Sequence, residues 1–306
     1  VLAAAPAQAG EGRVPAAGMI DLFRALATLC EPPQPETGRI AKALGLPRAP
    51  TEDEYAELFV FQLYPYASVY LGAEGMLGGE ARDRIAGFWR AIGETPPNDP
   101  DHLAVMLALY ARLAEFEQGA TEPLRRGALH RARMAFLWEH LLSWMPVYLN
   151  KLLEIAPPVY GAWAELLEKA LLGEARNLAG IDRLPLHLRE APPVPMQAPE
   201  VVSDVPGLVL VPVRSGIILT RADLARGARG LGLAPRVGER RFTLDALLGQ
   251  NPDGVVEWLT AEAHHWITRH EAQREILGEI ARFWAQRARR TAAWLSAFRG
   301  SAEVLA

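Results

Sequence analysis

The stretch LHRARMAFLWEHLLSWMPVYLNKLLE, residues 129–154, decides the fold class of this chain. Its large apolar side chains recur every three or four residues, which is the period of one face of an α-helix. They form one stripe: Met134, Leu137, Trp138, Leu141, Met145 and Tyr148. A stripe of large apolar side chains must be covered by other helices, so the segment predicts the centre of a helical bundle.

Helical signals recur on both sides of this stretch, whereas the alternation typical of strands is almost absent. The segment 51–64 opens with Thr51 and Glu54, the spacing of a capping box. Thr220 with Asp223 predicts a second capping box, and Asn251 before Pro252 predicts a further helix start. A last long helix is expected over about residues 271–299, with its aromatic side chains on one face. The only strand-like piece, GLVLVPV at 207–213, contains or adjoins prolines. The sequence therefore predicts an all-α fold.

Composition divides the chain into four parts. We expect a flexible N-terminus over residues 1–17 and a helical core over 18–180. Six prolines fall within a proposed linker at 181–206, and a C-terminal helical segment follows at 207–306.

The bulk numbers exclude several classes of protein. The 306 residues carry a formal net charge of −4, which argues against a general nucleic-acid binder. The single cysteine, Cys30, permits no internal disulfide and no thiolate metal cluster, and suits a reducing compartment. No apolar run approaches the ~20 residues of a membrane span. We expect no stable membrane insertion and a cytoplasmic protein, with VLAAAPAQAG at the start interpreted as a flexible segment.

A turn rich in acid and proline stands before the apolar helix LAVMLALYARLAE, residues 103–115. Asp99 is predicted to cap this helix, with Pro100 at its first position and the Asp101 carboxylate near the positive end of the helix dipole. His102 is left unexplained, because its position in a capping box prefers Glu or Gln. The turn is thus either a helix start alone, or one whose Asp101 and His102 contact a bound peptide.

Two further groups of side chains are potential peptide contacts. Tyr64, Tyr66 and Tyr70 follow a helix break and either line a groove for an apolar peptide or seal a helix junction. The second group lies on the central stretch and consists of Glu139, His140 and Trp144. The alternative for this group is a polar edge on a buried helix.

No local motif indicates catalysis or metal binding. The spacing His-Glu-x-x-His is absent, and no serine lies in a Gly-x-Ser-x-Gly setting. We therefore expect no catalytic residue, no metal and no cofactor. Arginines gather around the expected helix starts of the C-terminal segment: Arg214, Arg221, Arg236, Arg240 and Arg241. They are either solvated side chains paired with nearby carboxylates or a surface for an acidic partner.

Three pieces together resemble a known family. YAELFVFQLYPYASVYLG at 55–72, the pair Asp101-His102, and FLWEHLLSWMPVYL at 136–149 resemble the TorD/DmsD family in order and approximate spacing, over about residues 50–175. The family motif is Glu-Pro-x-Asp-His, of which this chain keeps the Asp-His half. Residues 207–306 look like the tail of longer TorD-like proteins.

The resemblance implies a TorD-like bundle that serves as a cytoplasmic chaperone. Its client would be an immature molybdenum-containing oxidoreductase of the dimethyl-sulfoxide-reductase type, or the leader peptide of such an enzyme. A twin-arginine leader would need carboxylates beside an apolar groove, and these could come from Asp99, Asp101 and the run Glu52, Asp53, Glu54 and Glu57. Either a monomer or a homodimer is compatible with such a fold.

Two alternatives stay open. One is a small-molecule hydrolase or nucleotide-binding protein that uses Asp101 and His102, and the other is a helical adaptor whose C-terminal arginines dock on an acidic partner. For the chaperone, alanine at both Asp101 and His102 is expected to abolish client capture and to leave stability nearly unchanged.

Overall fold

The computed structural model describes residues 16–178, 180, 183–195, 203–234, 236 and 238–304. These residues form helices and no strand, which confirms the all-α prediction. The proposed flexible N-terminus lies outside the described residues except at its last two positions, and part of the proposed linker also lies outside them. The described part of the chain up to residue 190 contains α1 (Ala16–Thr28), α2 (Thr37–Ala43), α3 (Glu52–Tyr55), the π-helix η1 (Ala56–Gln62), α4 (Ala67–Leu71), α5 (Gly79–Ala91), α6 (Leu103–Gly119), α7 (Pro123–Ala135), the π-helix η2 (Phe136–Leu141), α8 (Met145–Ile155), α9 (Pro158–Asn177) and α10 (Leu186–Glu190).

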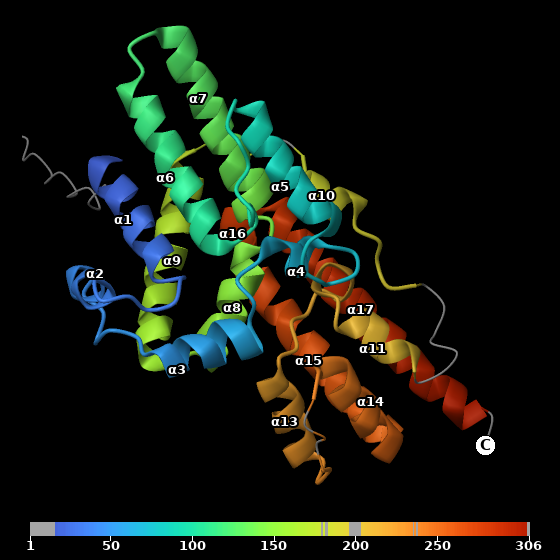
Figure 1. Cartoon of the computed structure of the whole chain (residues 1–306). Coiled ribbons are helices and arrows are strands. Elements are labelled where there is room, and N and C mark those ends of the chain that lie inside the picture. Colours follow the sequence, from blue (N-terminus) through green and yellow to red (C-terminus); the bar gives the residue numbers. More distant parts are fainter. Residues whose placement is uncertain are drawn as a thin grey trace, which may run out of the picture.

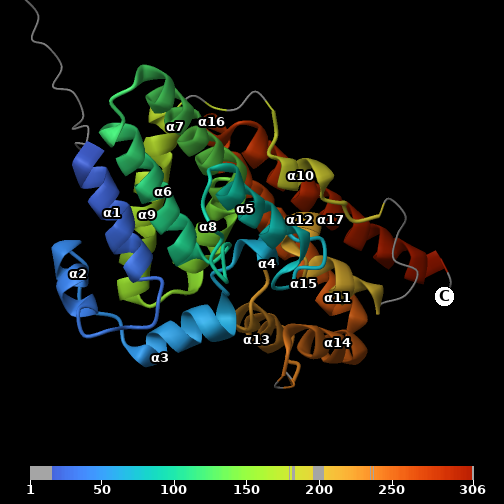
Figure 2. The ribbon, with the colours of Figure 1, turned by 45° about the horizontal axis from the view of Figure 1, so that its top comes forward.

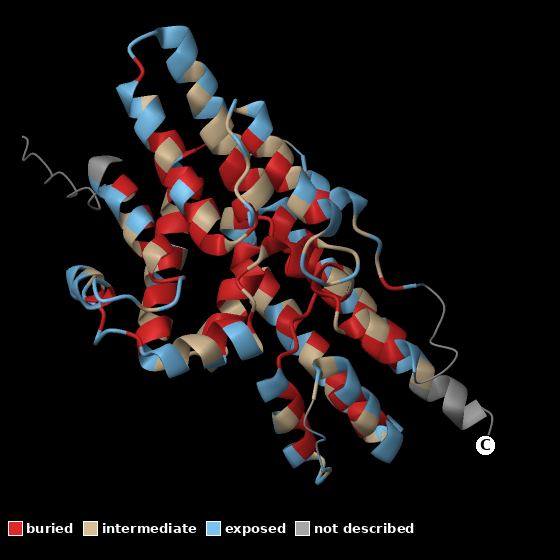
Figure 3. Ribbon diagram, viewed as in Figure 1, coloured by how far each residue is buried: buried red, intermediate tan, exposed pale blue. Residues whose placement is uncertain are grey.

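The N-terminal bundle is built around α6, whose Leu107 and Tyr110 are completely buried. Helix α1 packs against α6 and α9, and α8 packs against α9. The hairpin of α6 and α7 extends beyond this bundle, and its far end is exposed in Figure 3. Leu124 near the start of α7 is 89% exposed, so the first turns of that helix make no part of the core.

The C-terminal segment packs on the same core. It contains α11 (Asp204–Val209), α12 (Pro212–Ser215), α13 (Arg221–Gly230), α14 (Arg240–Gln250), α15 (Pro252–Ala272), α16 (Arg274–Leu277) and α17 (Glu279–Val304). Helices α15 and α17 lie side by side, α12 contacts α4, and α16 contacts α9. One hydrophobic cluster runs through both parts, and the buried indole of Trp284 donates to the backbone oxygen of Ser143 at 3.0 Å.

A buried ion pair fastens α13 to α8. The ammonium of Lys151 lies 3.0 Å from the Asp223 carboxylate, and each side chain is 1% exposed. Glu154 also accepts from Lys151, at 2.8 Å, and pairs with Arg226 and Arg269. The pKa of the Glu154 carboxyl falls to about 2, because the bonds from these three cations outweigh the opposing effect of burial.

Local signals in the sequence located several helix starts correctly. The capping box of Thr51 and Glu54 is present, as is that of Thr220 and Asp223. Asn251 caps α15 through its side chain, which accepts from the Gly254 amide at 3.0 Å.

The helices are interrupted or bounded differently from the sequence pattern at three places. The stretch 129–154 is divided into α7, η2 and α8 by a turn before Pro146, which cannot donate the backbone bond that a continuous helix needs. The last long helix begins at Glu279, because Gly278 has φ +52° and separates it from α16. The strand-like piece 207–213 forms the end of α11 and the start of α12.

Candidate functional site

The carboxylate of Asp101 is held inside the protein. Asp101 is 1% exposed, and its Oδ2 accepts a hydrogen bond from the Ser68 amide at 3.1 Å. Its backbone oxygen accepts from the Ala67 amide at 3.0 Å. Ala67 and Ser68 are the first residues of α4, so Asp101 satisfies two amides that a helix start leaves without partners. The primary task of this carboxylate is therefore to cap α4.

The structure corrects the predicted start of α6. The N-cap is His102 and not Asp99: the His102 Nδ1 accepts from the Ala104 amide at 3.3 Å. The backbone explains the difference, because His102 is extended and forms an isolated antiparallel bridge with Tyr66. A residue held in this extended conformation cannot be helical, so α6 begins at Leu103, directly after His102. Asp99 stays exposed, and its backbone oxygen accepts from the His102 amide at 3.2 Å.

His102 is partly buried against an aromatic ring. Its imidazole lies edge-on to Tyr66, with ring centroids 4.8 Å apart. Burial lowers the pKa of His102, and the charges of Asp99 and Asp101 oppose that shift. The neutral ring accepts one bond from the helix start and leaves Nε2 as its second polar atom.

The predicted tyrosines have different environments. Tyr64 and Tyr66 are partly buried, whereas Tyr70 is 2% exposed. The Tyr70 ring stacks on Trp144 at 5.3 Å, and its hydroxyl donates to the backbone oxygen of Tyr64 at 2.9 Å. Trp144 is fully buried. Tyr70 and Trp144 therefore form a helix junction, and only Tyr64 and Tyr66 reach the surface.

Glu139 and His140 lie at a second junction, beside α10. The Glu139 carboxylate accepts from the Leu186 amide at 2.8 Å, at the first residue of α10. His140 Nδ1 and His187 Nε2 are 3.2 Å apart, so the two rings share a hydrogen bond. Burial lowers the pKa of His140 to about 3 and that of His187 to about 4. Both rings are neutral near pH 7, and the pair holds α10 against η2.

An acid-rimmed apolar groove lies between the N-terminal bundle and α13. It encloses a volume of about 420 Å³ and is lined by Asp53, Glu54, Glu57, Leu58, Gln62, Ile155, Ala156, Pro157 and Ala222. Val60 and Phe61 of η1 are 44% and 47% exposed on the same short segment. Figure 2 shows α13 beside the end of the α3–η1 segment, where Gln62 Oε1 accepts from the Ala222 amide at 3.0 Å.

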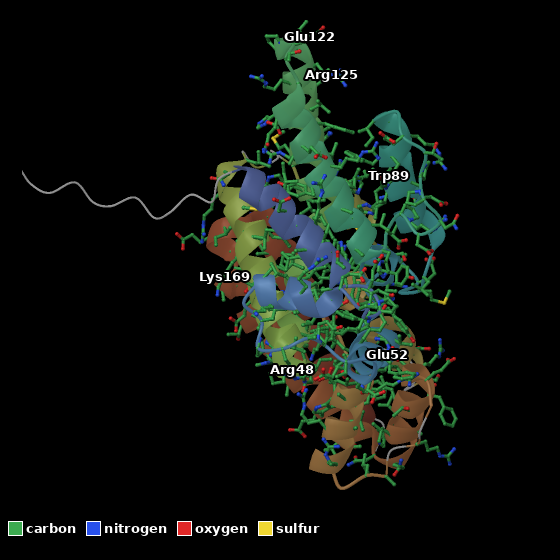
Figure 4. All side chains as sticks on the ribbon, turned by 60° about the vertical axis from the view of Figure 1, so that its left-hand side comes forward. Arg48, Glu52, Trp89, Glu122, Arg125 and Lys169 are labelled. Carbon is green, nitrogen blue, oxygen red and sulfur yellow. The ribbon has the colours of Figure 1, made fainter. Side chains whose placement is uncertain are left out.

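The carboxylates of the rim differ in their bonding. Glu54 pairs with Arg48, and the bonds from this guanidinium lower the pKa of the Glu54 carboxyl to about 2. Glu57 accepts from the side chain of Gln62 at 2.7 Å. Asp53 makes no ion pair with any described residue. Arg48 and Glu52 stand at the surface of this part of the molecule in Figure 4, well apart from Glu122 and Arg125 of the hairpin. At least one carboxylate is thus free to meet a cation.

Sequence reasoning found half of this groove. It singled out the acidic run of α3, but it placed the apolar part of the site at the tyrosines. Ile155, Ala156 and Pro157 follow α8, and Ala222 comes from the C-terminal segment. Nothing in their local sequence marks them as neighbours, because tertiary packing brings the end of α8 to α3 and the packing of α13 adds Ala222.

Neither a metal site nor a membrane span emerges from the described part of the chain. It contains no group of three or more His, Cys, Asp or Glu side chains placed to hold a metal ion. Its helices include none with the length and apolarity required to traverse a bilayer.

Comparison with known proteins finds similarity over part of the N-terminal bundle. Residues 31–150 match the family described as nitrate reductase delta subunit. The chaperone protein TorD of Vibrio vulnificus strain CMCP6 is 35% identical over 98 residues, which cover 29% of this chain and 44% of that protein. The TorD of Vibrio cholerae serotype O1 strain N16961 is 32% identical over 107 residues, covering 33% and 48%.

The chain therefore spans about half the length of the curated relatives it matches. The region that matches the family model contains α3, η1, α6 and the Asp101-His102 turn. Helices α9 to α17 lie beyond the family match.

Proposed function

We propose that this protein is a cytoplasmic, non-catalytic chaperone for an immature molybdenum-containing oxidoreductase of the dimethyl-sulfoxide-reductase type. It holds the enzyme, or its leader peptide, before cofactor loading or export. The similarity to proteins named TorD chaperones supports this class of function. The acid-rimmed groove supplies the physical argument for peptide binding.

The single observation that carries the proposal is the pairing of charge and apolar surface in that groove. Asp53 and Glu57 stand at the rim, while Leu58, Ile155 and Pro157 form the apolar wall. A segment with guanidinium groups followed by apolar residues matches this arrangement, because carboxylates bind guanidinium and an apolar wall removes side chains from water. We assign such a segment of the client to the groove.

The turn at residues 99–102 has a secondary role in this proposal. Asp99 is exposed, and His102, Tyr64 and Tyr66 are partly buried, so a client can touch these four members of the predicted site at the surface. Asp101, Tyr70, Trp144, Glu139 and His140 act through the helices they join.

Nothing at the turn favours the hydrolase alternative. A hydrolytic acid–base pair needs a carboxylate that orients the imidazole. The Asp101 carboxylate bonds to the Ser68 amide, and the His102 Nδ1 bonds to the Ala104 amide. Both groups are therefore engaged in fixing helix starts.

The test is a binding titration with a labelled peptide that carries two arginines followed by an apolar stretch. We expect the doubly substituted chain, Asp53→Asn with Glu57→Gln, to bind about tenfold more weakly, as removal of charge-assisted bonds worth about 1.4 kcal/mol would produce. Fluorescence anisotropy of the peptide measures the effect.

A matched control is Glu279→Gln, which removes an exposed carboxylate at the start of α17, outside the groove lining. It should change the affinity less than twofold. Equal binding by the doubly substituted chain and the parent protein would overturn the assignment of the groove.

A further inference from the structure

Three arginines converge where α12 meets α17. Arg287 and Arg290 are three residues apart on α17 and so share one face of it. Arg214 lies on α12, which packs against α17, and its charge acts on that of Arg287. The Ser215 backbone oxygen accepts from the Thr291 hydroxyl at 2.8 Å.

Gly216 permits this close approach. It has φ +75°, and a Cβ at this position would stand 2.3 Å from the Ala288 amide nitrogen and 2.7 Å from the Arg287 Cβ. The absence of a side chain thus lets the end of α12 lie directly on the turn of α17 that carries the arginines. Arg214, Arg287 and Arg290 are called the arginine triad below.

The triad has no partner of opposite charge among the described residues. Arg287 donates to the backbone oxygen of Ala191 at 2.5 Å and lies over the ring of Phe283 at 4.6 Å. The Nε atoms of Arg214 and Arg290 are buried and donate to no described acceptor. Burial and the charges of its two neighbours lower the pKa of Arg287 to about 10.

Several other partly buried arginines of this chain are paired with carboxylates, whereas Arg240 donates to the backbone oxygen of Leu219 at 2.8 Å. Arg84 pairs with Glu80 and Glu190, Arg133 with Glu117 and Glu174, and Arg269 with Glu154. Three guanidiniums gathered without a carboxylate repel one another, and burial of the Arg214 and Arg290 Nε atoms makes the two missing acceptors costly. The arrangement therefore calls for an anion.

We propose that the arginine triad binds a phosphate-bearing small molecule through its phosphoryl group. A phosphoryl group carries up to two charges and several acceptor oxygens, and it fits the fork of guanidinium donors. Three convergent cations within one turn of α17 and the adjacent α12 favour such a compact, multiply charged group over one carboxylate. The site lies outside the segment that matches the TorD-like family and is independent of the peptide groove.

Calorimetric titration of the full chain with pyrophosphate, and separately with inorganic phosphate, tests this proposal. At low ionic strength we expect saturable binding with one site, stronger for pyrophosphate. Arg290→Gln and Arg214→Gln should each weaken it at least tenfold. Arg290→Lys retains the charge but loses the fork, and should weaken it by several-fold.

Arg282→Gln provides the matched control, because Arg282 lies on the same helix and pairs with Glu279 at its surface. This variant should bind within twofold of the parent protein. Circular dichroism checks that each variant folds, and the charge-preserving lysine variant serves as the decisive one if the glutamine variants unfold.

Three results would overturn the proposal: no heat of binding up to about 10 mM pyrophosphate, an equal loss in Arg282→Gln, or saturable binding of an oligoglutamate peptide but not of either phosphate. The last result would instead assign the triad to an acidic polypeptide. Failure of the peptide titration at the groove leaves this outcome unaffected, because the two sites share no residue.

Discussion

The turn at residues 99–102 and the groove beside α3 are both acidic, but they use their carboxylates in opposite ways. Asp101 is buried and bonded to an amide of α4, whereas Asp53 stands at the rim of a groove without an ion-pair partner among the described residues. A carboxylate that completes a helix start is not free to bind a ligand. The difference teaches that a noticeable sequence motif can reflect a structural role in starting helices, with no need for a ligand.

The largest effect is expected from the ion pair behind the groove. Lys151→Met removes the buried ammonium from the Asp223 carboxylate, which keeps its pair with Arg226 at 2.9 Å, and should lower the free energy of unfolding by roughly 3 kcal/mol. Because α13 carries Ala222 of the groove wall, peptide affinity should fall as well. Urea unfolding and the peptide titration measure the two effects. Unchanged stability would show that Lys151 and Asp223 do not fasten α13.

The second largest effect is expected at the turn of residues 99–102, where Asp101 and Asp99 should differ in their contribution to stability. Asp101→Ala leaves the Ser68 amide without its acceptor and should lower the free energy of unfolding by roughly 1–3 kcal/mol. The exposed neighbour supplies the control, since Asp99→Ala should change stability by less than about 0.5 kcal/mol. If Asp101→Ala melted at the same temperature as the parent protein, Asp101 would again be interpreted as a residue that serves client contact.

Salt should weaken peptide binding at the groove but not the buried bond at the turn, and this effect should be smaller than those of the two substitutions above. Raising sodium chloride from about 50 mM to about 500 mM should weaken peptide binding several-fold, because exposed rim charges are screened over a few ångströms at high salt. The Asp101 bond to α4 is buried and should persist. Anisotropy titrations and melts at both concentrations give the comparison. Affinity insensitive to salt would argue that the rim carboxylates do not contact the peptide.

The smallest effect concerns the pKa of His102. Asp99 opposes the lowering of this pKa by burial, so Asp99→Asn should lower it further. The neutral ring caps α6, and its stabilising contribution is present above the unfolded pKa near 6.5 and is lost as the pH falls through the folded value. An NMR titration of the imidazole follows the shift. A pKa that rises in this variant would contradict the packing of the turn.

Local chemistry explains which features of the fold were predictable. The capping boxes at Thr51 and Thr220 and the Asn251 cap depend on neighbours within a few residues, so they can be identified in the sequence. The helix start at His102 was missed because its conformation is set by a backbone bridge to Tyr66, far away in the chain. The same reason explains why Tyr70 and Trp144 proved to be core residues.

The candidate sites depended still more on tertiary contacts. The acidic run of α3 was visible in the sequence, but the wall completed by Ala222 needed the packing of α13. The sequence grouped Arg214 with Arg221, Arg236, Arg240 and Arg241. In the structure Arg240 donates to the backbone oxygen of Leu219, and the charges of Arg214 and Arg290 act on Arg287.

The sequence by itself determined that the chain is helical and that it resembles the TorD/DmsD family, because periodicity, caps and short motifs are properties of neighbouring residues. Only the tertiary structure decided which charges are available for binding. That decision depends on burial and on hydrogen bonds between distant segments, which a one-dimensional pattern does not contain.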